Sequence, residues 1–194
     1  MNVYMQPLKD ELQEAWDNGI KTYDAATKKN FLMRVWYMYS MHDLPVYALF
    51  VGWCVHGRFP CPTCKEALEF RQLQAGGKYS CFDMHRQFLD PHYKFIKDKK
   101  NFIKGRDVKN SAPPALTGQQ TLDQLNTLEP DPERPGYFKG YNTEHAWSHK
   151  ICLWDLPYFK DLLCPHNINV MHTEKNVGEA LFGTLFGIEG KTKD

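Results

Sequence analysis

The sequence predicts a mixed α/β fold, and three observations support this prediction. Aromatic residues make up 14% of the 194-residue chain, which provides enough apolar surface for a hydrophobic core. Residues 7–16 and 170–188 have apolar side chains at the spacing of one helix face. Residues 31–41 and 147–154 are apolar and aromatic runs of the kind that form strands. We therefore expect helices and strands to share one core.

Residues 1–53 are predicted to form the first part of this core. A helix over 7–16 starts at a proline and stops before Gly19, and a brief strand over 20–24 follows it. The run 31–41 is too short for periodicity to separate a buried strand from a helix. Its Val, Trp and Tyr content favours an inner strand.

Asp43 directly follows that predicted inner strand. Folds of the α/β class usually place active-site groups at such strand ends, so Asp43 is a candidate catalytic residue. It can equally be a simple turn residue, because Leu44 and Pro45 come next and Asp is common in turns. The residue pattern leaves both interpretations open.

Residues 54–92 contain the strongest local motif of the sequence. Cys61 and Cys64 form a Cys-x2-Cys pair, and after sixteen intervening residues Cys81 and His85 form a Cys-x3-His pair. Three thiolates and one imidazole make a closed tetrahedral set of ligands for structural zinc. We therefore predict a Zn2+ knuckle inserted into the core, and four unrelated residues at these positions are the alternative.

Residues 93–145 are predicted to form a basic loop, a capped helix and a connector. The loop is rich in Lys and Arg, so it is either a surface for phosphate contacts or a solvated loop. The candidate DNA-binding residues are Lys97, Lys99, Lys100, Lys104 and Arg106. Thr117 and Gln120 have the spacing of a capping box at a helix start. Three prolines and two glycines in 129–141 indicate a mobile connector.

Residues 146–194 are predicted to complete the core with a helix over 170–188, whose N-cap is Asn169. Glu174 falls on the same face of this helix as Val177 and other apolar side chains. A carboxylate that faces a core is costly unless it is paired, protonated or bound to a metal. Glu174 is therefore a candidate metal ligand. A later helix start, or a pair with a buried Arg or His, would explain it without a metal.

Charge and apolar patterning restrict the classes of function. The net charge of +1 gives no overall attraction to nucleic acid, so any basic patch must be local. No apolar run has the roughly 18 to 20 residues that a membrane span needs, and the first residues lack a signal-peptide pattern. The six Cys are too sparse for a secreted disulfide scaffold. We expect an intracellular protein with reduced thiols, a bound ion and no membrane partner.

Together the motifs resemble the transposase of plant CACTA (En/Spm) elements, in the same order and almost from end to end. The matching segments are 3–8, 22–24, 42–45, 52–53, 61–64, 156–163, 166–177 and 188–194. This resemblance implies an RNase H-like domain of the acidic-triad class. In such domains, carboxylates hold two divalent ions, Mg2+ or Mn2+, and DNA strands are cut and rejoined.

The resemblance also assigns roles to residues and partners. Asp43 would be the second acid of the triad and Glu174 the third, with the zinc knuckle between them. Transposon DNA would be the partner, together with other transposase subunits or a protein that binds the terminal repeats. The location implied for such a protein is the nucleus.

Two departures from the family pattern bear on activity. The first acid of the triad is expected upstream of Met1, and Asn169 stands where family members have Asp. An amide is a weaker ligand for a divalent cation than a carboxylate. We therefore expect an incomplete RNase H-like domain and an inactive fragment of a cut-and-paste DNA transposase. The alternative function is a non-catalytic, zinc-dependent module, derived from a transposon, that binds DNA or protein.

Overall fold

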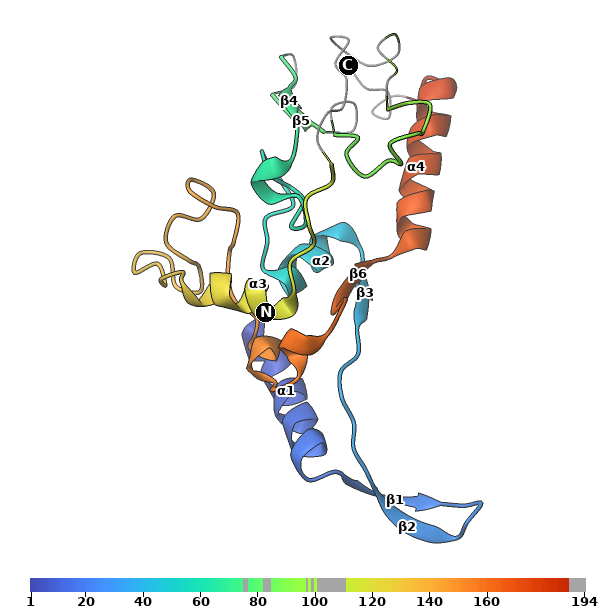
Figure 1. Ribbon diagram of the computed structural model, residues 1–194, viewed down its shortest axis with the longest axis vertical. Helices are drawn as coiled ribbons and strands as arrows, with labels where there is room; N and C mark the ends of the chain where they lie inside the picture. The colour runs from blue at the N-terminus through green and yellow to red at the C-terminus, as the bar shows by residue number, and fades with distance from the viewer. Residues whose placement is uncertain (75–76, 82–84, 97, 99, 101–110, 189–194) are drawn as a thin grey trace. The chain divides into compact units, whose positions relative to one another are not determined.

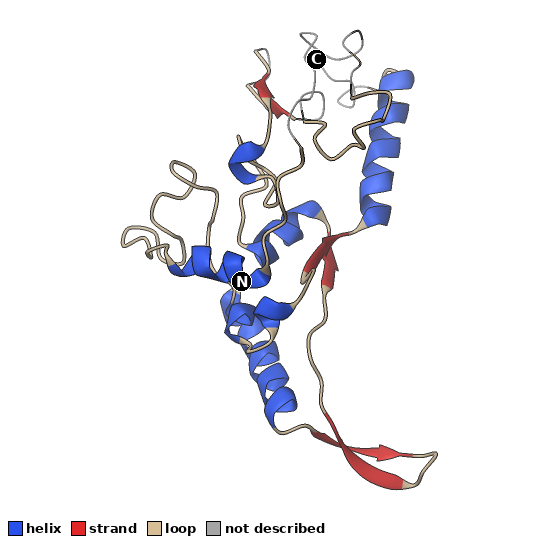
Figure 2. Ribbon diagram, viewed as in Figure 1, coloured by secondary structure: helices blue, strands red, loops and turns tan. Residues whose placement is uncertain are grey.

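The structure is a computed structural model, and it describes residues 1–74, 77–81, 85–96, 98, 100 and 111–188 (Figure 1). It confirms the mixed α/β class, because helices and short strands are both present (Figure 2). The elements in chain order are α1 (Asn2–Asp17), β1 (Ile20–Asp24), β2 (Lys29–Met33), β3 (Ser40–His42), α2 (Leu44–Val51), η1 (Lys65–Ala67), β4 (Arg71–Gln72), β5 (Tyr79–Ser80), α3 (Gly118–Asn126), η3 (Cys152–Asp155), η4 (Phe159–Asp161), β6 (His166–Ile168) and α4 (Val170–Leu185). The described strands pair as β1–β2, β3–β6 and β4–β5.

The chain divides into two compact units, and each unit is made of separate segments. Unit 1 comprises Met1–Gly52, Leu116–Lys139 and Ser148–Ile168, and unit 2 comprises Trp53–Ala115, Gly140–Trp147 and Asn169–Asp194. Each unit therefore depends on contacts between segments that are distant in the sequence. Within the described ranges, no helix is both long and apolar enough to cross a membrane.

Helix α1 begins earlier than the pattern predicts and includes Pro7 in its interior. Asn2 explains the early start, because its amide donates to the Lys150 carbonyl oxygen at 2.9 Å and its oxygen accepts the Cys152 N–H at 3.1 Å. Met1 is the N-cap and provides no side-chain hydrogen bond. A contact with a distant segment thus holds the first turn, which local capping leaves unsupported.

The prediction of one buried inner strand over 31–41 is wrong. Its first residues belong to β2, which forms an antiparallel hairpin with β1 and is exposed along its whole length. The chain then runs without regular structure through 34–39 and ends in the three-residue strand β3. The strand predicted over 20–24 is confirmed as β1. In Figure 1 the β1–β2 hairpin extends away from the rest of unit 1, which is why its apolar side chains stay in solvent.

Strands β3 and β6 are parallel, with His42 paired to Ile168. After β3 the chain turns at once into α2, an apolar helix that begins at Leu44 and has Pro45 in its first turn. Asp43 is the N-cap of α2, and Gly52 ends the helix in the left-handed conformation, with a φ of 73°. Unit 1 therefore places a strand end, a capping acid and a helix start in direct succession.

The core of unit 1 lies around the segment 151–159, where Leu153 and Phe159 are fully buried. The buried cluster consists of Ile151, Leu153, Leu156, Tyr158 and Phe159, with Met5, Leu12, Trp16, Tyr37, Phe50, Trp154 and Leu162 packed against it. The prediction that 147–154 is a strand is wrong, because η3 occupies its end and Trp147 forms an isolated bridge. The segment 156–163 contains one turn of helix, η4.

The predicted capping box at the start of α3 is confirmed. The Thr117 hydroxyl oxygen accepts the Gln120 N–H at 3.2 Å, and the Gln120 side chain accepts the Thr117 N–H at 2.9 Å. Gly118 then approaches η4 so closely that a Cβ at this position would lie 2.1 Å from the Lys160 carbonyl oxygen. With Leu125 buried on its inner face, α3 is held against the core segment.

Unit 2 is organised around two tryptophans. The rings of Trp53 and Trp147 meet edge to face, with centroids 4.9 Å apart, and the two residues form an antiparallel bridge. The Cys54 N–H donates to the Ala146 carbonyl oxygen at 2.9 Å beside this bridge. Unit 2 also contains the short β4–β5 hairpin and helix α4, whose N-cap is Asn169 as predicted.

Candidate functional site

Two of the other predicted zinc ligands, Cys61 and His85, lie close to Cys64 in unit 2. Sγ of Cys64 lies 3.1 Å from Nε2 of His85, and the Cys64 N–H donates to Sγ of Cys61 at 3.4 Å. Cys81 directly follows β5, and its carbonyl oxygen accepts the His85 N–H at 2.8 Å. The β4–β5 hairpin therefore returns the chain to the Cys61–Cys64 turn, as the two-pair motif requires.

The electrostatics of Cys64 reflect the other two thiols. Burial raises the pKa of the Cys64 thiol to about 12, and a hydrogen bond and charge from Cys61 and the charge of Cys81 act in the same direction. Thiolates packed this closely repel one another, so the neutral thiol is favoured when no cation is near. A divalent cation would reverse the effect, because it stabilises all the thiolates at once.

The residue types fit zinc, but their arrangement is not that of a formed site. Within the part of the chain that is described, no group of three or more His, Cys, Asp or Glu side chains is arranged to hold a metal. The Glu69 N–H donates to Nδ1 of His85 at 3.3 Å, so Nε2 carries the proton and donates to Cys64. The pKa of His85 is lowered by burial, and the negative charge of Glu69 only partly offsets this effect. Zinc can bind Nε2 only after that proton leaves. The zinc knuckle stays a prediction, which the contacts of Cys64 with Cys61 and His85 support.

The two strand ends in and next to unit 1 carry similar polar side chains. Asp43 follows β3, is half-buried and accepts the Val46 N–H at 3.1 Å. Asn169 follows Ile168, the last residue of β6, and accepts the His172 N–H at 3.2 Å. Each is the N-cap of the helix that comes next. The capping bond accounts for the local structure at Asp43, and the residue also keeps the strand-end position expected of a catalytic acid.

The prediction that Glu174 is turned into a core is wrong. Glu174 is exposed, and its neighbours on the same face, Val177 and Leu181, are 54% and 59% exposed. The helix face that the sequence pattern assigns to a core therefore meets no core among the described residues. Asp43 and Glu174 belong to different units, so the role of Glu174 stays a prediction from resemblance alone.

Most of the predicted DNA-binding residues, namely Lys97, Lys99, Lys104 and Arg106, lie outside the described residues. Lys100 is described and exposed, and its N–H donates to the Asp98 carboxylate at 3.0 Å. Earlier in the same stretch, the Lys94 ammonium lies 4.7 Å from the ring centre of Phe95. A DNA contact through this loop stays a prediction.

Unit 1 contains a polar network that the sequence pattern did not predict. Oγ of Ser40 lies 3.0 Å from Nδ1 of His166 and 2.6 Å from Nε2 of His42, and the Tyr37 hydroxyl donates to the Pro165 carbonyl oxygen at 3.0 Å. Nε2 of His166 is buried and has no hydrogen-bond partner among the described residues. The alternation of Ser40 and His42 on one strand face was the available signal. The network links β3 to β6 immediately before Asp43.

His166 makes the stability of unit 1 dependent on pH. Burial, with a smaller effect of His42, lowers the pKa of His166 to about 4, whereas an imidazole in an unfolded chain has a pKa of about 6.5. Between these values the unfolded chain binds more protons than the folded chain. Stability is therefore full above about pH 6.5 and falls by about 3 kcal/mol as the pH drops to 4. Urea unfolding measured across this range tests the slope.

Two variants separate His166 from other sources of acid sensitivity. His166→Gln does not titrate, so its unfolding free energy should change less with pH than that of the parent, whatever its value at pH 7. His172→Gln is the control, because His172 is exposed on α4, and it should keep the parent slope. An unchanged slope in His166→Gln would contradict the assignment.

The fold and the site together define a class: a mixed α/β protein with an acid at the end of a parallel strand pair and a cluster of cysteines and a histidine in a second unit. A family model described as "Transposase family tnp2" matches residues 1–128, which is more than half of the chain. The chain belongs to this transposase family. No curated protein and no solved structure matches it.

Proposed function

We propose that this chain derives from the catalytic region of a cut-and-paste DNA transposase of the plant CACTA (En/Spm) type, with an RNase H-like core. Membership of the transposase family supports an origin in DNA transposition. The observation that carries the catalytic part is the pair of strand ends, where Asp43 and Asn169 each follow one strand of the parallel pair. Active-site groups of α/β folds gather at such ends. The proposed partner is transposon DNA in the nucleus.

The residues present do not complete a site for the divalent ions of such an enzyme. When bound, Mg2+ or Mn2+ activates the attacking oxygen and stabilises the leaving oxygen of the phosphodiester. Asp43 supplies one carboxylate, but Asn169 supplies a neutral amide, and the described residues contain no further group arranged to hold a metal. We therefore propose that the chain, as it stands, does not cut DNA.

Asn169→Asp tests this proposal without disturbing the helix, because Asn and Asp are equally good N-caps. The added carboxylate should strengthen Mn2+ binding by about tenfold or more, since ligand charge is the main determinant of affinity at oxygen sites. Asp43→Asn, which also keeps its N-cap, should reverse this gain when placed in the Asn169→Asp chain. Calorimetric titration with Mn2+ measures both effects.

A strand-cleavage assay then separates the proposals. The parent chain, incubated with Mg2+ or Mn2+ and transposon-end duplexes, should release no product above the level of Asp43→Asn. Cleavage by the parent that Asp43→Asn abolishes would contradict the proposed inactivity and support the catalytic assignment of Asp43. If Asn169→Asp leaves Mn2+ affinity unchanged, the strand-end site itself is wrong.

A second function is favoured by the contact between Cys64 and His85. A zinc-dependent module that binds DNA or protein needs the knuckle but neither Asp43 nor Glu174. In this case chelation of zinc should abolish binding to transposon DNA, and Asp43→Asn should leave it unchanged. The opposite pattern would favour the catalytic origin over the binding module.

A further inference from the structure

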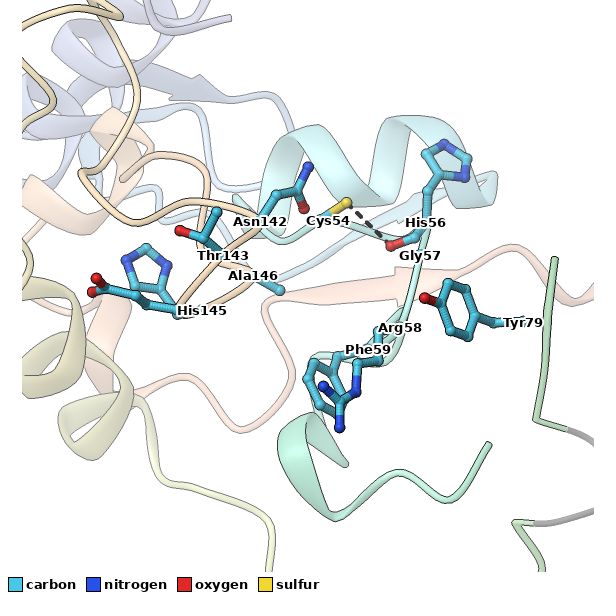
Figure 3. A pocket seen from close by; sticks show the side chains of 11 residues that line it. Cys54, His56, Gly57, Arg58, Phe59, Tyr79, Asn142, Thr143, His145 and Ala146 are labelled. Carbon is cyan, nitrogen blue, oxygen red and sulfur yellow. Dashed lines mark hydrogen bonds between the residues drawn. The ribbon is translucent and has the colours of Figure 1, made fainter. Parts of the chain in front are cut away.

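A cavity in unit 2 belongs to neither proposed metal site. It has a volume of about 520 Å3, in the range of pockets that hold small molecules (Figure 3). Three parts of unit 2 line it: residues 54 and 56–59, the β5 residue Tyr79, and residues 142–146. The hydrogen bond from Cys54 to Ala146 joins two of these walls, and the Trp53 ring N–H donates to the Phe59 carbonyl oxygen at 2.8 Å.

Arg58 is the cation of this cavity. Its guanidinium lies 5.0 Å from the ring centre of Phe59 and 5.1 Å from that of Phe70, so two rings hold the charged plane in place. Arg58 is exposed, and no carboxylate or other acceptor among the described residues pairs with it. A guanidinium with oriented and unused donors is a receptor for a phosphate or a carboxylate.

Aromatic rings form the adjoining wall. Phe70 contacts Phe59 and Tyr79 edge to face, with centroids 5.9 and 5.3 Å apart, and Tyr79 is 38% exposed. In Figure 3 the hydroxyl end of Tyr79 points toward the segment that carries Arg58 and Phe59. The exposed Tyr79 ring and the half-buried Phe59 ring both line the cavity, and a nucleobase of any sequence can stack on such a ring.

The loop 142–146 adds polar groups at the opposite side. Asn142 has a φ of 65°, and the Thr143 hydroxyl donates to the Gly140 carbonyl oxygen at 3.0 Å, so the loop is a tight turn with the Asn142 amide exposed. Glu144 lies next to it as an acceptor. An amide and a carboxylate can pair with the donors and acceptors on the edge of a base.

These three features describe one ligand class: a planar base with polar edges that is attached to a phosphate. We propose that the cavity binds a single unstacked nucleotide of single-stranded DNA, with its phosphate on Arg58 and its base against Phe59 and Tyr79. This inference rests on the proposed DNA function and adds a site to it that does not involve Asp43. A phosphate alone would leave the rings unused, and an uncharged aromatic ligand would leave Arg58 unpaired.

Fluorescence anisotropy with a labelled single-stranded oligothymidine of about twelve nucleotides tests the site on the full chain. Arg58→Ala and Tyr79→Leu should each weaken binding by about tenfold, through the lost phosphate contact and the lost stacking surface. Arg134→Ala is the matched control, because the Arg134 guanidinium is also exposed and lies 4.8 Å from the ring centre of Tyr137, in unit 1. It removes the same charge and should change affinity less than twofold, or about 0.4 kcal/mol.

Four outcomes would overturn the proposal. Equal losses of oligonucleotide affinity in Arg58→Ala and Arg134→Ala would show that general charge attraction causes the binding. If Arg58→Ala and Tyr79→Leu weaken binding to a matched duplex as much as binding to the single strand, no unstacked nucleotide is needed. If free thymidine monophosphate binds as tightly as the oligonucleotide and Arg58→Ala abolishes this, the ligand is a free nucleotide and not DNA. Normal oligonucleotide binding by all variants would show that the cavity is not the binding site and would leave the transposase proposal standing. The absence of DNA cleavage by the parent chain has no bearing on the cavity.

Discussion

Replacing Gly52 with alanine is expected to destabilise unit 1 by about 4 kcal/mol or more, a large part of the stability of a typical domain. Gly52 has a φ of 73°, which costs an alanine about 1 to 2 kcal/mol. A Cβ at this position would also lie 2.0 Å from the His149 carbonyl oxygen. The Gly52 carbonyl oxygen accepts the Ser148 N–H at 2.7 Å, so the two segments cannot separate without losing this bond. Urea unfolding followed by circular dichroism measures the loss.

Two other glycines of unit 1 separate the cost of the positive φ from the cost of the Cβ clash. Gly136 has a φ of 87° and no atom within 4 Å of a Cβ, so Gly136→Ala should cost about 1 kcal/mol from the backbone alone. Gly118 has no left-handed backbone, but its Cβ would meet the Lys160 carbonyl oxygen at 2.1 Å, so Gly118→Ala reports the clash. A loss in Gly52→Ala no larger than that in Gly136→Ala would show that the contact with His149 is not needed for the fold.

Replacing Cys64 with serine is expected to lower bound zinc from about one ion per chain to near none. Cys64 is the buried member of the cluster and contacts both His85 and Cys61, so its loss removes the centre of the ligand set. Structural zinc contributes on the order of 10 kcal/mol to the folding of a small knuckle. Residues 54–92 should therefore also become sensitive to limited proteolysis. Metal analysis by mass spectrometry measures the zinc.

Cys152→Ser is the matched control, because Cys152 is a buried free thiol in unit 1, outside the cluster. It should keep the zinc of the parent chain. The Cys64 thiol must lose its proton to bind zinc, and its pKa is raised to about 12 in the metal-free cluster. Zinc should consequently bind more weakly at pH 6 than at pH 8. Unchanged zinc content in Cys64→Ser would show that these residues do not form a zinc knuckle.

Features that depend on neighbours within one helical turn were predictable from the sequence. The Thr117–Gln120 capping box and the Asn169 N-cap form because donor and acceptor lie three residues apart on the chain. The four residues of the proposed knuckle were found by spacing, and the structure brings Cys64 into contact with Cys61 and His85. The position of Asp43 at a strand end was also predicted, because the polar residues and Pro45 interrupt the apolar run at this point.

Burial and pairing were not predictable in the same way, because they depend on segments far apart in the sequence. The run 31–41 has the composition of a buried strand, but β2 pairs with β1 alone and β3 pairs with β6, so the run is split and mostly exposed. Glu174 shares a face with apolar residues, yet within the part of the chain that the structure describes those residues stay exposed.

The sequence by itself determined the transposase-like motifs, the helix caps and the set of candidate zinc ligands, because each is a matter of residue type and short spacing. The tertiary structure alone decided the His42–Ser40–His166 network, the approach of Gly52 to His149 and the cavity at Arg58. All three depend on contacts across many residues of chain, and local patterns carry no information about which distant segment will supply the partner.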